Sequence, residues 1–246
     1  MAQQIDTENM IRQALNENSP LVQFQPIINL KIPAMACYAM QIHIEGTDNR
    51  LLSERDLRRP GVDAGLRYEL DRWIVSRGLK SLLSLRKVTP LSRLYINLSG
   101  STVSNPEFPD WVSRQLKLNE MVGAGLIFSF RISDITKNIN GAYKVFHQLQ
   151  KINVETCISQ FPDNPKAFEL LKFFRAEYLS VTSRLLKADK GTIKAMVDNA
   201  HKLKCKILLT DIDNAESVEL NWATGADLLQ GRYIQGYRDE MSFEFG

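Results

Sequence analysis

Five consecutive units, each an apolar strand followed by a helix, constrain the fold of this chain more than any other feature of its sequence. The strands are predicted at residues 93–99, 125–132, 154–159, 176–181 and 205–210. The helices are predicted at 107–118, 140–151, 165–174, 190–203 and 215–223. Repeats of about 25–30 residues in this order favour parallel strands with the helices packed over them.

The first third of the chain supplies the remaining elements. A helix is predicted at 6–17, strands at 21–30 and 34–44, a short helix after Ser53, and a long helix from about residue 62. A short closing strand at 226–231 brings the strands to eight. A chain of 246 residues has the length of a barrel of eight strand–helix units. We expect a single domain over 1–246, with the barrel at 21–236 and a tail at 237–246.

Composition excludes several classes of protein. No run of 18 apolar residues exists, so no membrane span is predicted. Cys37, Cys157 and Cys205 are far apart, which indicates reduced thiols and a cytoplasmic protein. The three histidines match no metal-binding spacing. A net charge of +3 is too small to indicate nucleic-acid binding.

Three short segments carry a family resemblance. They are Phe24-Gln25-Pro26-Ile27, Ile96-Asn97-Leu98-Ser99 and Gln230-Gly231, and they occur in the order in which EAL domains carry similar motifs. Over nearly its whole length the chain resembles the EAL family of cyclic di-GMP phosphodiesterases. The resemblance implies an α/β fold, a TIM-like (β/α)8 barrel whose first strand is antiparallel. A degenerate site and the terminal segment 241–245 are most similar to FimX-type non-catalytic receptors.

The positions that hold metal or catalyse hydrolysis in that family are altered. Aligned with the family motifs, they read Tyr38, Arg131, Ser159, Gln160, Ser180 and Thr210, and only Asn97 is retained. Divalent cations prefer carboxylate oxygens, which these side chains lack. A dication about 4 Å from the Arg131 guanidinium would meet roughly 8 kcal/mol of repulsion at an effective dielectric of about 20. We therefore expect no metal site, no cofactor and no phosphodiesterase activity.

Ligand binding is a separate question. By resemblance, the candidate nucleotide-binding residues are Gln25, Met40, Asn97, Arg131, Phe161, Gln230 and Gly231. Arg131 is expected either to grip a phosphate or to pair with Asp134 or Asp211. Tyr38 is expected to fill the vacated metal pocket, Ile42 removes an arginine that the family uses on a phosphate, and the charged stretch 55–59 is expected to be a solvated face.

The predicted function is that of a catalytically inactive EAL domain, which serves as a cyclic di-GMP receptor or as a protein-docking module. The resemblance implies a PilZ-domain partner and a role in type IV pilus regulation and twitching motility. Two alternatives stay open: a protein-interaction domain that no longer binds cyclic di-GMP, and an active phosphodiesterase with displaced ligands.

Overall fold

The strands form a closed barrel in the computed structural model of the protein, which describes residues 2–46, 51–59, 61–182, 190–215, 218 and 224–246. Within these residues the barrel strands are β1 (Leu21–Asn29), β2 (Cys37–Glu45), β4 (Arg93–Asn97), β5 (Leu126–Arg131), β6 (Glu155–Ser159), β7 (Tyr178–Thr182), β8 (Lys206–Thr210) and β9 (Leu228–Gln230). They follow the order β1-β9-β8-β7-β6-β5-β4-β2, and a β1–β2 pairing closes the ring. Strand β1 is antiparallel to both β2 and β9, which confirms the predicted reversed first strand.

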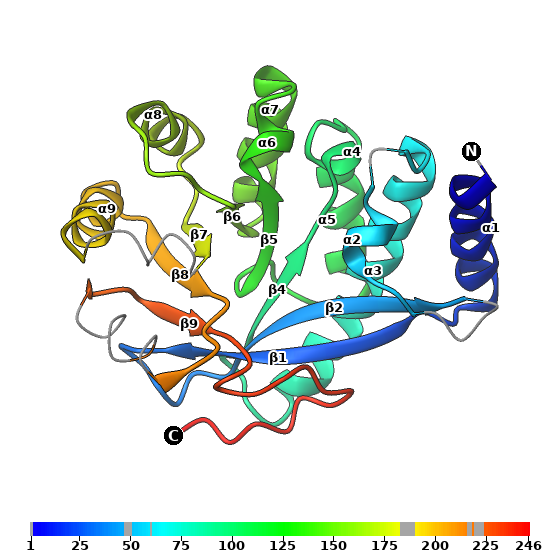
Figure 1. Ribbon diagram of the computed structural model, residues 1–246. Coiled ribbons are helices and arrows are strands. Elements are labelled where there is room, and N and C mark those ends of the chain that lie inside the picture. The colour runs from blue at the N-terminus through cyan, green and yellow to red at the C-terminus, as the bar shows by residue number, and fades with distance from the viewer. Residues whose placement is uncertain (1, 47–50, 60, 183–189, 216–217, 219–223) are drawn as a thin grey trace.

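Helices surround the barrel (Figure 1). They are α1 (Ala2–Glu17), α2 (Glu54–Leu57), α3 (Ala64–Arg86), α4 (Gly100–Val103), α5 (Phe108–Leu118), α6 (Ile132–Ile135), α7 (Ile139–Lys151), α8 (Pro165–Phe174) and α9 (Lys190–Lys202). The short elements α4, α6 and β3 (Leu51–Leu52), which pairs with β2, were not predicted. Most of the helix predicted at 215–223 lies outside the described residues.

Short polar side chains start several of these helices. Asp63 accepts from the backbone N–H of Leu66 at 2.9 Å at the start of α3. Asn164 does the same for Ala167 at 2.9 Å, and Pro165 follows it as the first residue of α8. Such caps satisfy backbone donors that the first helical turn leaves without partners. These helices therefore begin at positions that the local sequence specifies.

The strands separate two buried layers. One cluster fills the bore of the barrel and includes Cys37, Ala39, Tyr95, Cys157 and Leu208. The larger cluster lies between the strands and the helices, and its members alternate with the first set along each strand. Alternation follows from the two-residue period of a strand, which sends neighbouring side chains to opposite faces of the wall.

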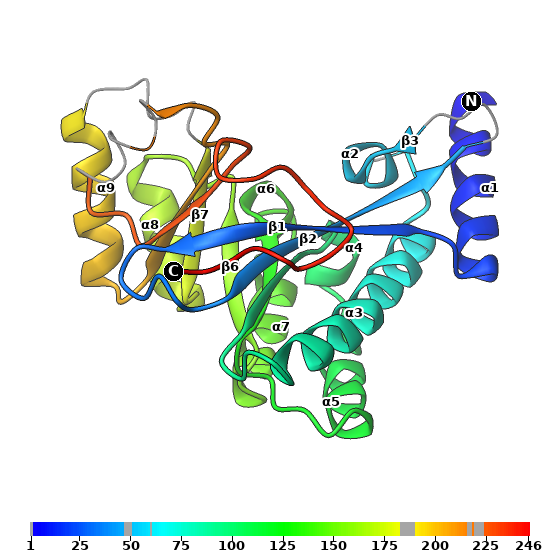
Figure 2. The same cartoon turned by 90° about the horizontal axis from the view of Figure 1, so that it is seen from below.

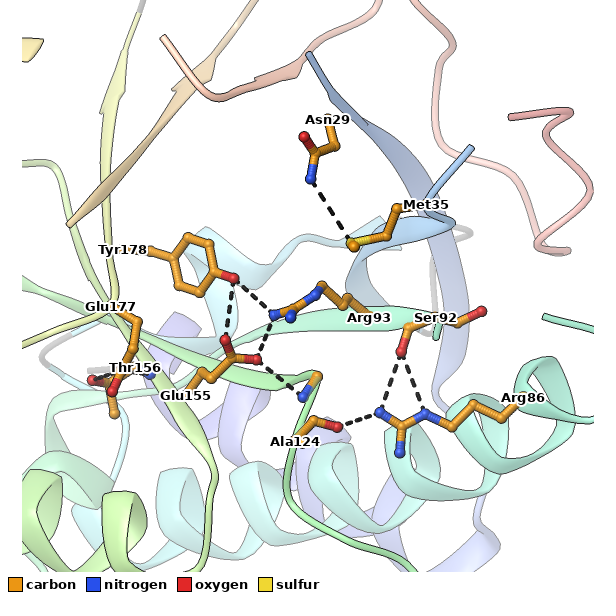
Figure 3. A network of polar contacts seen from close by, with 11 residues as sticks. Asn29, Met35, Arg86, Ser92, Arg93, Ala124, Glu155, Thr156, Glu177 and Tyr178 are labelled. Carbon is orange, nitrogen blue, oxygen red and sulfur yellow. Dashed lines mark hydrogen bonds and ion pairs between the residues drawn. The ribbon is translucent and has the colours of Figure 1, made fainter. Parts of the chain in front are cut away.

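A polar network closes the end of the barrel where the parallel strands begin (Figure 3). Arg93 lies 2.5 Å from the Glu155 carboxylate and donates to the Tyr178 hydroxyl at 2.8 Å. Glu155 also accepts from the backbone N–H of Gly125 at 3.0 Å. In barrels of this kind the amino-terminal end of the strands is usually devoted to stability. We assign this network a structural role.

The C-terminal tail runs alongside β1 in both views of the molecule (Figures 1 and 2). Arg238 and Phe24 exchange two backbone hydrogen bonds, of 2.7 and 2.9 Å, so the tail extends the barrel wall at this point. None of the described helices is both long and apolar enough to cross a lipid bilayer.

Candidate functional site

A cavity of about 630 Å³ opens at the end of the barrel where the parallel strands finish. Its lining includes the final residues of six strands: Asn97, Arg131, Ser159, Thr182, Thr210 and Gln230. Active sites of eight-stranded barrels lie at this end, because side chains of many strands converge there. The volume is in the range of small-molecule sites. This cavity is the candidate functional site.

Tyr95 lies deeper in the same cavity, two residues before the end of β4. The side chain is buried, and among the described residues its hydroxyl oxygen has no hydrogen-bond partner. Burial raises the pKa of Tyr95 well above its ordinary value, so the group stays a hydroxyl. The wall of the cavity thus holds an unsatisfied polar group.

Helix α2 and its C-cap contribute three charged side chains to the lining: Glu54, Arg55 and Arg58. The prediction of a solvated face at 55–59 is wrong for Arg58, which is only 8% exposed. Arg55 is exposed, but it lines the cavity. The sequence does show a helix start at Ser53. The position of this helix against the cavity depends on the path of the chain between β2 and α3. No local sequence pattern predicts that path.

Arg58 is held from several sides. Its guanidinium donates to the carbonyl oxygen of Asn97 and lies 3.8 Å from the nearest carboxylate oxygens of both Glu54 and Asp71. Asp71 in turn accepts from the Ser99 backbone N–H at 2.7 Å and from the Thr102 hydroxyl at 2.6 Å. Asp71 therefore fixes both Arg58 and the start of α4 beside the cavity.

The Glu54 carboxylate is poorly satisfied by comparison. Its Oε2 accepts from Nδ2 of Asn97 at 3.5 Å, which is long for a hydrogen bond. Its Oε1 is buried and has no hydrogen-bond partner among the described residues. Burial raises the pKa of Glu54 above its ordinary value, an effect that Arg58 and Asn97 partly offset.

Arg131, predicted either to grip a phosphate or to pair with an acidic side chain, lines the cavity from the end of β5. The structure also shows the alternative pairing, with Nε of Arg131 lying 3.6 Å from Asp134 Oδ2. Lys137 contacts the other oxygen of Asp134 at 2.7 Å. Because Arg131 pairs through Nε, its terminal nitrogens can donate to a further acceptor.

The predicted role of Tyr38 is wrong. Its side chain lies outside the bore, packed against Phe245 at a ring distance of 5.2 Å, and its hydroxyl accepts from the Phe243 backbone N–H at 3.0 Å. The neighbouring Ala39 lines the cavity instead. The alignment with the family motif was off by one residue, and an offset of one residue assigns every side chain of a strand to the wrong face. The position that faces the cavity is therefore Ala39, which also offers no carboxylate.

The same shift removes two further candidates from the cavity. Met40 is fully buried in the outer layer, where its sulfur approaches Gly78 of α3, so the prediction that it packs on a base is wrong. Ile42 is also fully buried in that layer, so no side chain at that position reaches the cavity.

Three more predicted contact residues are packed against, or hydrogen-bonded to, other groups of the protein. Phe161 is fully buried against Phe168 at a ring distance of 5.2 Å, and so it cannot stack on a base. Gln25 is 4% exposed, and its amide accepts from Gln230 Nε2 and donates to the Gln235 carbonyl, each at 2.8 Å. Gly231 packs against the Ile212 backbone.

Of the seven predicted contact residues, Asn97, Arg131 and Gln230 line the cavity. Of the six altered positions, five line it: Arg131, Ser159, Gln160, Ser180 and Thr210. Sequence reasoning missed Glu54, Arg55, Arg58, Tyr95 and Tyr237. Tyr95 belongs to the same strand as Asn97, two residues earlier, so strand alternation was a signal that could have identified it.

The residues present do not fit a pair of divalent cations. The described lining has two carboxylates, Glu54 and Asp211, against three arginines. Arg58 occupies one side of Glu54, and the strand ends supply neutral hydroxyls and amides together with the Arg131 guanidinium. Within the described part of the chain, no group of three or more His, Cys, Asp or Glu side chains is placed to hold a metal. Hard dications need anionic oxygens, which this set supplies poorly.

A closed barrel with a reversed first strand and a polar cavity at the strand ends defines a class of α/β barrels. Within that class the chain belongs to the EAL domain family, whose sequence model matches residues 8–237.

Two curated relatives match the sequence of this chain over most of its length. It is 25% identical over 239 residues to the cyclic di-GMP phosphodiesterase PdeF of Escherichia coli (strain K12), a match covering 92% of this chain and 31% of that protein. It is 21% identical over 239 residues to an uncharacterized 76.5 kDa protein in the phbC 3' region of Thiocystis violacea, covering 97% of this chain and 34% of that protein. The chain thus spans about a third of the length of these relatives.

Solved structures share the fold. A FimX EAL domain has a TM-score of 0.91 at 22% identity, covering 98% of this chain and 99% of that one. The Pseudomonas aeruginosa FimX EAL domain bound to c-di-GMP has a TM-score of 0.89 at 22% identity, covering 98% and 100%. The Xanthomonas citri FimX EAL domain in complex with c-diGMP has a TM-score of 0.89 at 20% identity, covering 100% and 98%.

Proposed function

We propose that this EAL domain binds cyclic di-GMP at the barrel mouth without hydrolysing it, and that it acts as a receptor or docking module in bacterial cyclic di-GMP signalling. The observation that carries the proposal is the composition of the cavity. Its strand ends present hydroxyls, amides and a guanidinium where a hydrolytic site needs carboxylates for metal. Two similar FimX EAL domains are known with c-di-GMP bound, which supports a ligand of that kind here.

The arginines explain how an anionic ligand is held without metal. Cyclic di-GMP carries two phosphodiester charges, and Arg55 and Arg131 line the cavity from α2 and from the end of β5. A guanidinium fork matches phosphate oxygens and keeps its charge at any physiological pH. In this proposal Arg131 takes over the charge neutralisation that a cation performs in a hydrolytic relative.

Two measurements on the purified domain test the proposal. Calorimetric titration with cyclic di-GMP should show saturable binding, and the melting temperature should rise with ligand concentration, because binding to the folded state alone stabilises it. Incubation with cyclic di-GMP and Mg²⁺ or Mn²⁺ should give no linear product. Turnover that Asn97→Ala abolishes would overturn the proposal.

Substitution of Arg131 tests its role in binding. Arg131→Ala should weaken cyclic di-GMP binding about tenfold, as expected for the loss of one charge-assisted contact. Lys137→Ala is the matched control, because it removes the other cation that contacts Asp134 and lies outside the cavity lining. Equal affinities of wild type and Arg131→Ala would show that Arg131 does not hold a phosphate.

A second candidate function is a docking domain that binds no nucleotide. The burial of Met40 and Phe161 and the engagement of Gln25 by other protein groups favour it, because these residues are withdrawn from the cavity. Absence of binding in the titration would select this alternative.

The proposal extends to a cytoplasmic location, a PilZ-domain partner and a role in type IV pilus regulation, each implied by the resemblance to FimX-type proteins. The three cysteines are free and buried, which suits a reducing compartment. Co-purification of the domain with a PilZ protein of the same organism, with and without cyclic di-GMP, tests the partner.

A further inference from the structure

Glu54 stands out among the residues of the cavity because its acceptor capacity is unused. Its Oε1 has no hydrogen-bond partner in the described part of the chain, and its Oε2 has only the 3.5 Å contact with Asn97. A buried acceptor without a donor is costly to maintain, so each such group calls for a partner, and at the wall of a cavity a ligand can supply the donor.

Arg58 does not explain the presence of Glu54. The two groups are 3.8 Å apart, which is too long for a hydrogen bond. Arg58 already has the Asn97 carbonyl oxygen as an acceptor and the buried Asp71 as a counter-ion. The arginine would thus remain neutralised without Glu54, and in the described part of the chain the only hydrogen bond that the Glu54 carboxylate accepts is the long one from Asn97.

The other charged side chains of the lining indicate which further groups a ligand of this cavity carries. Arg55 and Arg131 are suited to anionic groups, whereas the less exposed Glu54 is suited to neighbouring N–H donors. Among the common bases, guanine has two adjacent donors on one edge, N1–H and the 2-amino group, which match the two oxygens of a carboxylate. Adenine presents an acceptor at N1 and would meet the carboxylate with repulsion.

We propose that Glu54 is the specificity-determining residue of the cavity, accepting hydrogen bonds from N1–H and from the 2-amino group of one guanine base. This inference rests on the proposed function, since it assigns one contact of the cyclic di-GMP that the cavity is proposed to bind. It makes helix α2 the element that distinguishes guanine from other bases, while the arginines hold the phosphates of any cyclic dinucleotide.

The test compares two ligands that differ only at the proposed contact. Cyclic di-IMP lacks the 2-amino group of cyclic di-GMP and is otherwise the same molecule. Wild type should bind cyclic di-GMP about tenfold more tightly than cyclic di-IMP, as one lost hydrogen bond to a charged acceptor predicts. Glu54→Gln should weaken cyclic di-GMP binding by about tenfold to a hundredfold and bring the ratio of the two affinities close to one.

Glu45→Gln is the matched control, because Glu45 is exposed at the end of β2 and lies outside the cavity lining. It should leave both affinities unchanged. The ratio of affinities is the decisive readout, since a general loss of folded protein would weaken both ligands equally. The wild-type ratio alone also tests the idea if Glu54→Gln does not fold.

The outcomes separate this inference from the function on which it rests. If wild type binds cyclic di-GMP and cyclic di-IMP equally, or if Glu54→Gln leaves the ratio unchanged, the role of Glu54 is refuted and the receptor function stands. If wild type binds neither ligand, the receptor function itself fails.

Discussion

At the scale of single residues, Gly231 lies where its own backbone and that of Ile212 approach each other closely. A Cβ added there would lie 2.1 Å from the carbonyl oxygen of Ile212 and 2.3 Å from its nitrogen. The two segments also exchange hydrogen bonds, from Ile212 to the Gln230 carbonyl at 3.1 Å and from Tyr233 to the Ile212 carbonyl at 3.0 Å. Only glycine allows this approach, so Gly231 shapes the cavity rim through packing.

Gly231→Ala should therefore destabilise the protein. The methyl group meets backbone atoms, which cannot rotate away, so we expect the free energy of unfolding to fall by at least about 2 kcal/mol. Urea denaturation followed by circular dichroism measures the change. Gly236→Ala is the control, because a Cβ there meets nothing within 4 Å. Similar midpoints for the two variants would refute the packing argument.

At the scale of elements, Arg175 caps the C-terminus of helix α8 in a left-handed backbone conformation, although it is not a glycine. Arg175 has φ of 54° and donates its backbone N–H to the Leu171 carbonyl at 2.9 Å. Glycine adopts this conformation without a steric penalty.

Arg175→Gly should raise the free energy of unfolding by about 0.5–1 kcal/mol, because it relieves this strain at the C-terminus of α8. Lys172→Gly, at an exposed position within the same helix, should lower it by about 1 kcal/mol. Chemical denaturation of both variants measures the two opposite shifts. A loss of stability in Arg175→Gly would contradict the prediction.

The tail is a second element whose role can be tested. Phe243 and Phe245 contact each other at a ring distance of 4.9 Å, and Phe245 contacts Tyr38 at 5.2 Å. Their partial burial alternates with exposed Ser242 and Glu244, as in a strand with one face covered.

Phe245→Ala should lower the free energy of unfolding by about 1–2 kcal/mol, less than the cost at a fully buried site, because the ring is only partly covered. Thermal denaturation measures this loss, and Glu244→Ala, on the exposed side of the tail, should leave the melting temperature unchanged. If both variants melt like the wild type, the tail does not stabilise the barrel wall.

At the scale of the whole molecule, Asp227 joins the segments that close the barrel. Its carboxylate contacts Lys31 at 2.5 Å, His201 of α9 at 2.8 Å and the Ile207 backbone N–H of β8 at 2.9 Å. Its own carbonyl accepts from the N–H of Leu30 at 2.9 Å. The segment before β9 is thereby tied to the end of the reversed strand β1, to strand β8 and to helix α9.

Acid should weaken this closure. Burial raises the pKa of Asp227, but hydrogen bonds from Lys31, Ile207 and His201 outweigh it and hold the pKa below its ordinary value of 3.8. The ionised carboxylate therefore stabilises the fold fully above about pH 4 to 5, and this stabilisation is lost as the pH falls through the folded-state pKa.

Asp227→Asn should lower the free energy of unfolding by about 2 kcal/mol at pH 7, since it removes hydrogen bonds to a charged group. The difference from the wild type should shrink as the pH falls below 3.8. Urea denaturation at several pH values measures both curves. A difference that stays constant down to pH 2 would show that Asp227 does not act through its charge.

The order of strands and helices could be read from the sequence, because apolar periodicity, caps and turn residues are local properties of the chain. The reversed first strand was predicted only through the family resemblance, and the structure confirmed it. The neutral strand ends at Ser159 and Thr210 were also visible, because a residue that ends a strand is identified by its position in the sequence.

Local sequence patterns were enough to predict the barrel and the scarcity of carboxylates at its strand ends. Which side chains face the cavity depends on the packing of the whole chain. In strand β2, Gln41, His43 and Glu45 share a face with Ala39, so strand alternation was a local signal that Ala39 and Tyr38 point to opposite sides. Closure of the barrel decided that the face with Ala39 is the inner one. The position of Glu54 and Arg58 beside Asn97 joins residues about forty positions apart. Such contacts depend on how the whole chain packs, and no local pattern encodes them.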